Sequence, residues 1–313
     1  MRRGRGRRYV REVIRIDAAV EGSLLAIVRR LERATEPAVE IDVLDPDRGR
    51  GLHAGERVEI DGATYVHRPF RTWVDLAERL GYRLATPRPL APPRLRLVFE
   101  RLAPPVGEQI DDATEKYGAR SRFARTSKLE DPGFVIDFAE ALERTAVPGD
   151  ARVLDLGVNQ GDELALIAAL RPDLAEAAFT GVDHSATALA IARSRFPRAT
   201  LVEADLDAPL ALAGRFELVL AIATLQSAAI DDRELLRRIV QDHLAPSGAV
   251  IFGVPNCRIV DGETRYGARM MNFHQPELGL LVKDVAFYRK YLQQHGRRVF
   301  VTGKNYVFVT AIV

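Results

Sequence analysis

The second half of the chain alternates short apolar runs with helix-like segments, and this alternation limits the possible folds more than any other feature. The run VLDLG at 153–157 is apolar and ends in glycine, as expected for a buried strand of a parallel sheet. The segment GDELALIAAL at 161–170 follows with the apolar spacing of a helix. Repeated strand–helix units of this kind predict an α/β fold, doubly wound, with helices on both faces of a mostly parallel sheet.

The alternation continues to the end of the sequence. Ser185 stands where a helix N-cap is expected, ahead of ATALAIARSRF. The last two β-rich runs, RRVFVTG and YVFVTAIV, predict a terminal hairpin that brings the sheet to seven strands and adds an antiparallel strand at one edge. The other predicted strands are 178–183, 199–205, 215–223 and 248–256, and the other predicted helices are 231–244 and 284–296.

The first part of the chain predicts a smaller α+β domain. Asp61-Gly62 lies between two alternating runs, which is a strong hairpin signal, and strand-like and helix-like segments surround it. A ferredoxin-like arrangement is one topology that this order allows. The predicted organisation is a basic tail at 1–8, an N-terminal domain of unassigned role at 9–102, a linker and helical segment at 103–150, and the α/β domain at 151–313.

Charge and cysteine content narrow the function classes. The formal net charge is +2, but residues 1–8 hold five arginines and no acid, so the remainder carries 40 basic and 43 acidic side chains. A nucleic-acid enzyme usually has a basic surface on its folded body. The tail is therefore either an RNA-binding arm or a solvated chain end. No apolar run is long enough for a membrane helix or a secretory signal, and the single cysteine favours a reducing, cytoplasmic setting.

The turn between the first strand and first helix of the α/β domain has the composition of a ligand-binding turn. In an open α/β sheet, ligands bind beyond the carboxyl ends of the strands, and glycines let the backbone approach them closely. The segment Asp155–Gly161 lacks the third glycine of a dinucleotide-binding GxGxxG motif. It also lacks the Gly-Lys-Ser/Thr of a P-loop. Asn159 stands between Gly157 and Gly161, and asparagine tolerates positive φ better than most residues.

This segment resembles motif I of the class I (Rossmann-like) S-adenosylmethionine-dependent methyltransferases, an acid and a bulky residue followed by GxGxG, with Asn159 in place of the middle glycine. The resemblance covers 151–313 and implies S-adenosyl-L-methionine as the cofactor. It implies that Asp183, at the end of the second strand, accepts hydrogen bonds from the ribose hydroxyls. It also implies that Asp205 meets the adenine amino group while Leu206 packs on the ring. The cofactor-binding residues expected from it are Asp155, Gly157, Asn159, Gly161, Asp183, Asp205, Leu206 and Arg122.

Two further segments are candidates for shaping the site. Residues 111–134 contain Arg122, which either pairs with the cofactor carboxylate from a segment folded over the cofactor or belongs to an ordinary amphipathic helix. Residues 257–283 predict a long irregular loop of the kind that often forms a lid, and its His274 is either a general base or a packed or solvated histidine. Cys257 lacks the neighbouring motif of RNA cytosine methylases, so a buried, inert thiol is the expectation.

Methyl transfer from a sulfonium depends mainly on positioning, so a catalytic base is optional and the acceptor is hard to identify. Three functions remain open. The first is a methyltransferase acting on a small molecule, in agreement with the neutral body. The second is an RNA methyltransferase whose N-terminal domain and arginine-rich tail bind the substrate. The third is a non-catalytic cofactor-binding or scaffold protein, which the Asn159 departure would suit. The six histidines are scattered and predict no metal site.

Overall fold

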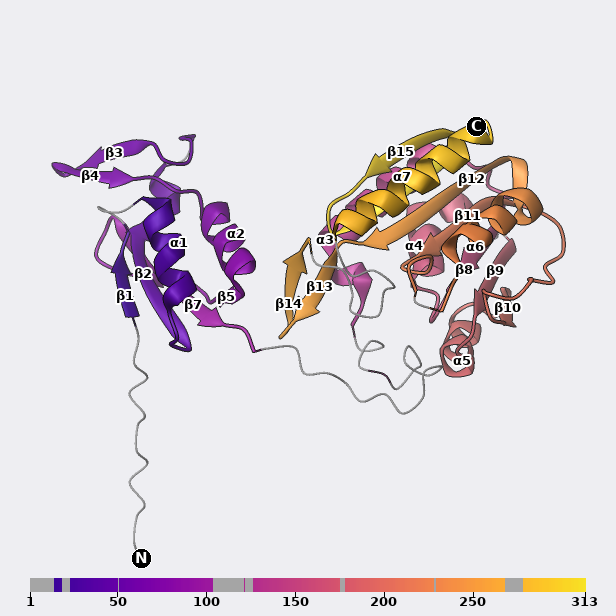
Figure 1. Cartoon of the computed structure of the whole chain (residues 1–313), viewed down its shortest axis with the longest axis horizontal. Helices are drawn as coiled ribbons and strands as arrows, with labels where there is room; N and C mark the ends of the chain where they lie inside the picture. Colours follow the sequence, from indigo (N-terminus) through magenta and orange to yellow (C-terminus); the bar gives the residue numbers. More distant parts are fainter. Residues whose placement is uncertain are drawn as a thin grey trace, which may run out of the picture. The chain divides into compact units, whose positions relative to one another are not determined.

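The chain forms two compact units in the computed structural model (Figure 1), which describes residues 14–18, 23–49, 51–103, 121, 126–174, 178–227, 229–267 and 278–313. The N-terminal unit comprises Met1–Val106 together with Ile259–Arg265. The C-terminal unit comprises Gly107–Arg258 and Tyr266–Val313. None of the helices among the described residues is long and apolar enough to cross a membrane.

The N-terminal unit is a small sheet with two helices packed on one face. Alternation along β2 sends Val39, Ile41 and Val43 into the core beneath the helices, while Glu40 and Asp42 point to the opposite face of the sheet. The sheet order is β1-β2-β7-β5, with β6 also paired to β7. The elements are β1 (Ile14–Asp17), α1 (Leu24–Arg33), β2 (Ala38–Leu44), β3 (Arg57–Ile60), β4 (Ala63–Val66), α2 (Phe70–Leu80), β5 (Tyr82–Leu84), β6 (Arg88–Pro89) and β7 (Arg94–Arg101).

The ferredoxin-like prediction for this unit is wrong. In a split βαβ arrangement another strand lies between the two parallel strands. Here β1 pairs directly with β2 in parallel, Ile14 opposite Val39, and α1 makes the connection between them. The predicted hairpin is present as β3–β4, with Asp61 at φ 49° and Gly62 at φ 77° in its turn.

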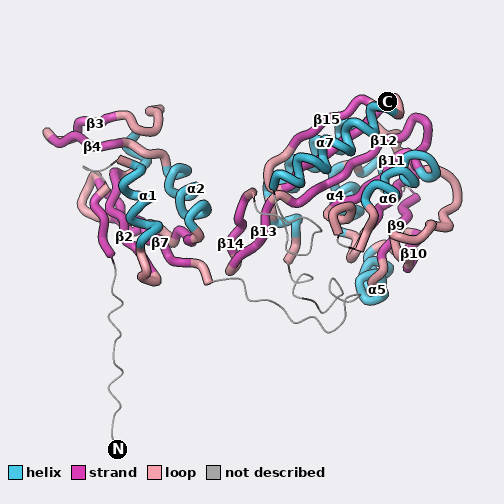
Figure 2. Tube along the Cα trace, viewed as in Figure 1, coloured by secondary structure: helices cyan, strands magenta, loops and turns pink. Residues whose placement is uncertain are grey.

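The C-terminal unit is a doubly wound sheet of seven strands in the order β10-β9-β8-β11-β12-β16-β15, and it confirms the predicted α/β fold. Neighbouring strands from β10 to β12 are parallel, whereas β16 runs antiparallel to both of its neighbours. Figure 2 shows these strands lying side by side, with α7 along one face. The elements are α3 (Pro132–Thr145), β8 (Arg152–Leu156), α4 (Asp162–Leu170), β9 (Ala178–Asp183), α5 (Ala186–Arg195), β10 (Thr200–Glu203), β11 (Phe216–Ile222), α6 (Asp232–Arg238), β12 (Leu244–Pro255), α7 (Leu278–Gln294), β15 (Arg298–Thr302) and β16 (Tyr306–Ile312). The strands β13 (Cys257–Val260) and β14 (Glu263–Tyr266) fall mostly within Ile259–Arg265, which belongs to the N-terminal unit.

Two apolar layers cover the two faces of this sheet. One layer joins α3, α4 and α5 to the strands through side chains such as Phe138, Ile167 and Leu189. The other joins α6 and α7 to the opposite face through side chains such as Leu235 and Tyr288. Val153 of β8 belongs to the first layer, and Leu154 and Leu156 belong to the second, so this strand has apolar side chains on both of its faces.

Three details differ from the sequence predictions. The antiparallel strand of the terminal hairpin is not at the edge, because β16 lies between β12 and β15. The segment 257–283 is not irregular throughout, because β13 and β14 form a hairpin around Asp261-Gly262 and α7 begins at Leu278. The helix predicted at 231–244 is shorter: α6 ends at Arg238, one π-helical turn follows, and β12 begins at Leu244.

Candidate functional site

The turn after β8 has the backbone of a ligand-binding turn. Gly157, Asn159 and Gly161 have φ values of 81°, 45° and 82°, so the asparagine takes the left-handed conformation expected of a glycine. The N–H groups of Gly157 and Val158 both donate to the carbonyl of Val182, at 2.8 and 3.1 Å, and tie the turn to the end of β9. The departure at Asn159 therefore leaves the shape of the turn intact.

Close packing under the turn explains its glycines. A Cβ on Gly157 would lie 2.4 Å from Oγ1 of Thr224, and one on Gly161 would lie 2.8 Å from the Phe196 ring. Thr224 follows β11 and donates from its hydroxyl to the carbonyl of Leu156 at 2.8 Å. This contact links the ends of β8 and β11, and the sequence prediction did not include it.

Asp183 connects the turn to the next helix. Its Oδ2 accepts the N–H of Asn159 and its Oδ1 accepts the N–H of Ser185, both at 2.9 Å. The hydroxyl of Ser185 in turn accepts the N–H of Ala188 and caps α5 as predicted. Each oxygen of Asp183 retains a lone-pair site, because a carboxylate oxygen can accept more than one hydrogen bond.

Asp205 lies beyond the end of β10, next to Asp183 in the sheet order. The N–H of Ala204 donates to the carbonyl of Asp183 at 3.0 Å, which holds the two strand ends together. Asp205 is exposed and accepts the N–H of Asp207 at 2.9 Å. Leu206 is buried in the core, and its carbonyl accepts a hydrogen bond from Arg238 at 2.8 Å.

Asp155 lies at the end of β8, fully buried beneath the turn. Neither of its carboxylate oxygens has a hydrogen-bond partner among the described residues. Burial, then the negative charge of Glu163, raises the pKa of Asp155 well above its usual value, although the Lys128 ammonium partly offsets this.

An ion pair between the half-buried Lys128 and the buried Glu163 lies beside Asp155. The ammonium of Lys128 donates to Oε1 of Glu163, a side chain only 1% exposed, while Oε2 of Glu163 has no partner among the described residues. Burial alone would lower the pKa of Lys128, but Glu163 and its other anionic neighbours raise it above its usual value. Burial also raises the pKa of the nearby Tyr306 to about 12. The sequence prediction missed this pair, and the available signal was that Glu163 shares a helix face with the buried Ile167, four residues on.

A second polar cluster follows β11, where the sequence prediction assigned no role. Ala223 takes φ 58°, and the buried Gln226 donates to the hydroxyl of Tyr288 at 3.2 Å. That hydroxyl donates to Asp232 at 2.7 Å. Burial and then Asp232 raise the pKa of Tyr288, so the phenol stays protonated and links the loop to α6 and α7.

Some predicted site residues cannot be placed. Arg122 and His274 lie outside the described residues, so their predicted contacts remain predictions. Cys257 is a buried thiol at the start of β13. Among the residues that the structure describes, no group of three or more His, Cys, Asp or Glu side chains could hold a metal ion.

Comparison with known proteins agrees with this geometry. Residues 153–248, which contain the turn and all three strand-end carboxylates, match the family model of a methyltransferase domain. The C-terminal unit holds a class I S-adenosylmethionine-dependent methyltransferase domain. Its mostly parallel seven-stranded sheet and the positive-φ turn after β8 agree with the fold and the glycine-bearing turn that the sequence resemblance implied.

The relatives match only the part around this domain. A trans-aconitate 2-methyltransferase of Methylobacterium nodulans is 34% identical over 141 residues, 42% of this chain and 52% of the relative. Another, from Variovorax paradoxus, is 34% identical over 119 residues, 38% of this chain and 44% of the relative. The chain spans about half the length of these relatives. A solved S-adenosylmethionine-dependent methyltransferase from Mesorhizobium loti is 20% identical, with a TM-score of 0.39, over 56% of this chain and 96% of that one.

The methyltransferase domain fits the cofactor of its family. S-adenosylmethionine supplies a sulfonium methyl group and carries a second cation, its ammonium. The buried carboxylates of Asp155 and Glu163 share one cation, Lys128, and three of their four oxygens have no hydrogen-bond partner among the described residues. A buried carboxylate without a partner is costly, so this excess negative charge suits a cationic ligand. Asp183 keeps acceptor capacity for a diol at the same strand ends.

Proposed function

We propose that the chain is an S-adenosylmethionine-dependent methyltransferase that acts on a small-molecule acceptor. The observation that carries the proposal is the set of three carboxylates, Asp155, Asp183 and Asp205, at the ends of adjacent strands around a positive-φ turn. The match of residues 153–248 to a methyltransferase domain supports it. The names of the relatives, which specify a small organic acid, support the class of acceptor.

The residues of the chain hold and orient the donor in this proposal. Asp183 accepts the ribose hydroxyls, Asp205 meets the adenine amino group, and Leu206 lies against the ring. The turn from Gly157 to Gly161 lets the backbone approach the donor, and Asp155 balances its positive charge. Arg122 pairs with the donor carboxylate, and His274 is the candidate base if the acceptor must lose a proton. We assign donor binding to 151–313, with 103–150 as the segment leading into it, 9–102 as a separate domain, and the cytoplasm as the location.

Calorimetry with S-adenosylhomocysteine tests the donor site. We expect binding to the wild-type chain, and binding weaker by at least on the order of 100-fold for Asp183→Ala, because two hydrogen bonds to a charged group are lost at about 1.5–3 kcal/mol each. Asp173→Ala is the matched control, since it removes a carboxylate that pairs with Arg171 on the surface of the same unit. No binding heat with the wild-type chain, or equal binding by all three proteins, would contradict the donor site.

A labelled-donor experiment tests the acceptor. The chain is incubated with methyl-labelled donor and a cell extract separated into small-molecule, protein and RNA fractions, with a panel of small carboxylic acids in parallel. Label in the small-molecule fraction or the panel supports the proposal. Label in RNA would show an RNA methyltransferase instead. Donor binding without transfer to any fraction would indicate a non-catalytic cofactor-binding protein.

A further inference from the structure

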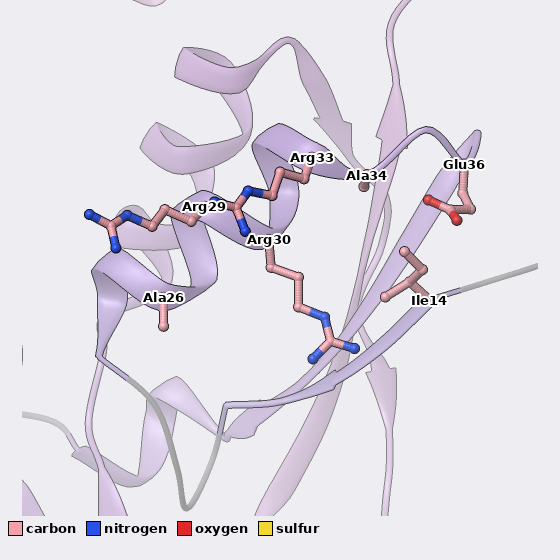
Figure 3. A pocket seen from close by; sticks show the side chains of 7 residues that line it. All are labelled: Ile14, Ala26, Arg29, Arg30, Arg33, Ala34 and Glu36. Carbon is pink, nitrogen blue, oxygen red and sulfur yellow. The ribbon is translucent and has the colours of Figure 1, made fainter.

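The N-terminal unit has a hollow between α1 and the start of β1. Its volume is about 400 Å³. Figure 3 shows that the Arg30 side chain extends from α1 toward the strand that begins at Ile14. The lining combines a basic rim with a small apolar wall and one acid: Arg29, Arg30 and Arg33, then Ile14, Ala26 and Ala34, and finally Glu36.

The helix pattern places these arginines on the surface. Ile27 and Leu31 turn α1 toward the sheet and are buried, which leaves Arg29, Arg30 and Arg33 exposed. Arg29 and Arg33 lie about 6 Å apart along the helix axis. Their guanidinium groups can therefore contact neighbouring anionic groups of one extended ligand.

The arginines of the hollow differ from those on the sheet of the same unit. On the sheet, Arg15, Arg83, Arg94 and Arg96 each form an ion pair with a carboxylate. On α1, none of the three arginines forms an ion pair within the described part of the chain.

Positive charge is also concentrated here along the sequence. Residues 1–36 contain ten arginines and five acids, whereas residues 37–313 contain 35 basic and 38 acidic side chains. The arginine-rich residues 1–13 are joined to the wall of the hollow at Ile14. The first 36 residues therefore carry a net positive charge, which would attract a polyanion.

We propose that the hollow binds a single strand of RNA. Guanidinium groups contact phosphates through paired N–H donors and can stack on bases, and the adjoining apolar wall can receive a sugar or base. An acidic peptide would satisfy the charges, but the apolar wall beside the arginines favours a ligand that has flat apolar faces next to each anionic group. The site lies outside the donor-binding unit, so the inference does not depend on the proposed function.

Fluorescence anisotropy of a short labelled RNA strand, with full-length protein and no donor, tests the proposal. The variant is Arg29→Gln/Arg30→Gln/Arg33→Gln. The matched control is Arg48→Gln/Arg57→Gln/Arg79→Gln, which removes the same charge from three exposed arginines of the same unit that do not line the hollow. Thermal melting checks that both remain folded. Titrations at salt concentrations from about 50 to 200 mM give the salt slope.

We expect the hollow variant to bind RNA on the order of 10-fold more weakly at the lower salt. Its slope of log affinity against log salt should be shallower by about 2, because three phosphate contacts on a single strand contribute about 0.7 each. The control should retain most of the wild-type affinity and slope. Absence of RNA binding by the wild-type chain, or equal losses in the two variants, would overturn the proposal. So would binding of a poly-glutamate peptide as tight as that of RNA. Calorimetry with S-adenosylhomocysteine should be unchanged in the hollow variant, so the two proposals can fail separately.

Discussion

The two units of the chain differ in where their charged side chains lie and in how these side chains are paired. On the sheet of the N-terminal unit, carboxylates are matched by arginines close to solvent: Asp42 accepts two hydrogen bonds from Arg96, at 2.6 and 2.9 Å, and Glu40 lies 3.1 Å from Arg15. The Arg96 contact holds the pKa of Asp42 below its usual value. On α1 of the same unit, the exposed Arg29, Arg30 and Arg33 form no ion pair within the described part of the chain.

In the C-terminal unit, two carboxyl groups are buried near the cofactor turn, one at the end of β8 and one in the first turn of α4. Asp155 and Glu163 are almost completely inaccessible and share the single ammonium of Lys128. Solvent screens unmatched cations on a surface, so they cost little. A buried carboxylate is costly unless a positive charge compensates it. The exposed arginines of α1 therefore suit an anionic ligand, and the buried carboxylates of the methyltransferase domain suit a cationic one.

The largest expected effect comes from removing the shared cation. Lys128→Met should lower the free energy of unfolding by about 3–5 kcal/mol, because breaking a buried ion pair leaves an uncompensated charge. Urea denaturation measures the loss. Lys290→Met, an exposed lysine on α7, is the control and should change stability by less than about 0.5 kcal/mol.

Adding Glu163→Gln to Lys128→Met should recover part of the lost stability, since the double variant no longer buries the unpaired charge of Glu163. If Lys128→Met proved as mild as Lys290→Met, the contrast between a buried and an exposed charge would not hold at this site.

The second largest effect concerns the shape of the turn. Gly157→Ala should cost about 2–3 kcal/mol, because alanine at φ 81° is strained and its Cβ would lie 2.4 Å from Oγ1 of Thr224. S-adenosylhomocysteine binding should weaken together with stability. Thr224→Ala in the same chain removes the nearest atoms but not the backbone strain, so rescue should be partial. Full stability in the single variant would show that the turn is looser than its contacts imply.

The sequence predicted those parts of the fold that depend on a short repeating pattern. The strand at 178–183 and the Ser185 cap are local signals, and the structure has both. The left-handed conformation at Asn159 also followed from residue chemistry alone. The Asp261-Gly262 hairpin has the same local signal as Asp61-Gly62, although the sequence prediction for 257–283 is an irregular loop.

What the sequence did not predict depends on contacts between distant segments. Lys128 meets Glu163 across 35 residues, and Thr224 meets the Leu156 carbonyl across 68. The position of β16 between β12 and β15 likewise rests on pairing with β12, which is far from β16 in the sequence. No periodicity encodes such pairs, because each becomes close only when the sheet has formed.

A smaller effect, with a distinctive pH dependence, is expected at Asp155. Asp155→Asn keeps the shape of the side chain, and the wild-type carboxylate has no hydrogen-bond partner among the described residues that would be lost. In the unfolded chain this carboxyl loses its proton near its ordinary pKa of about 3.9. In the folded chain burial raises that pKa. Between the two values the unfolded state binds fewer protons, so the free energy of unfolding of the wild type falls as the pH rises.

Without donor, Asp155→Asn should therefore match the wild type near pH ~4 and be the more stable protein near pH ~8. Thermal melting across this range measures the difference. Donor binding should show the reverse order, because a cationic ligand favours the ionised carboxyl that the asparagine lacks. If the difference in melting temperature between Asp155→Asn and the wild type were the same at every pH, Asp155 would not be the buried, uncompensated acid of the site.

The smallest expected effect lies on the sheet of the N-terminal unit. Arg15→Gln removes a guanidinium whose Nε and Nη2 both donate to Oε2 of Glu40, at 3.2 and 3.1 Å. The Arg15 side chain is 62% exposed, and Arg96 remains 3.3 Å from Glu40. We expect a loss of about 0.5 kcal/mol or less in urea denaturation, decreasing further at high salt. A loss comparable with that of Lys128→Met would mean that geometry, and not burial, decides how much a charge pair contributes in this chain. Burial would then not explain why α1 suits an anionic ligand and the methyltransferase domain a cationic one.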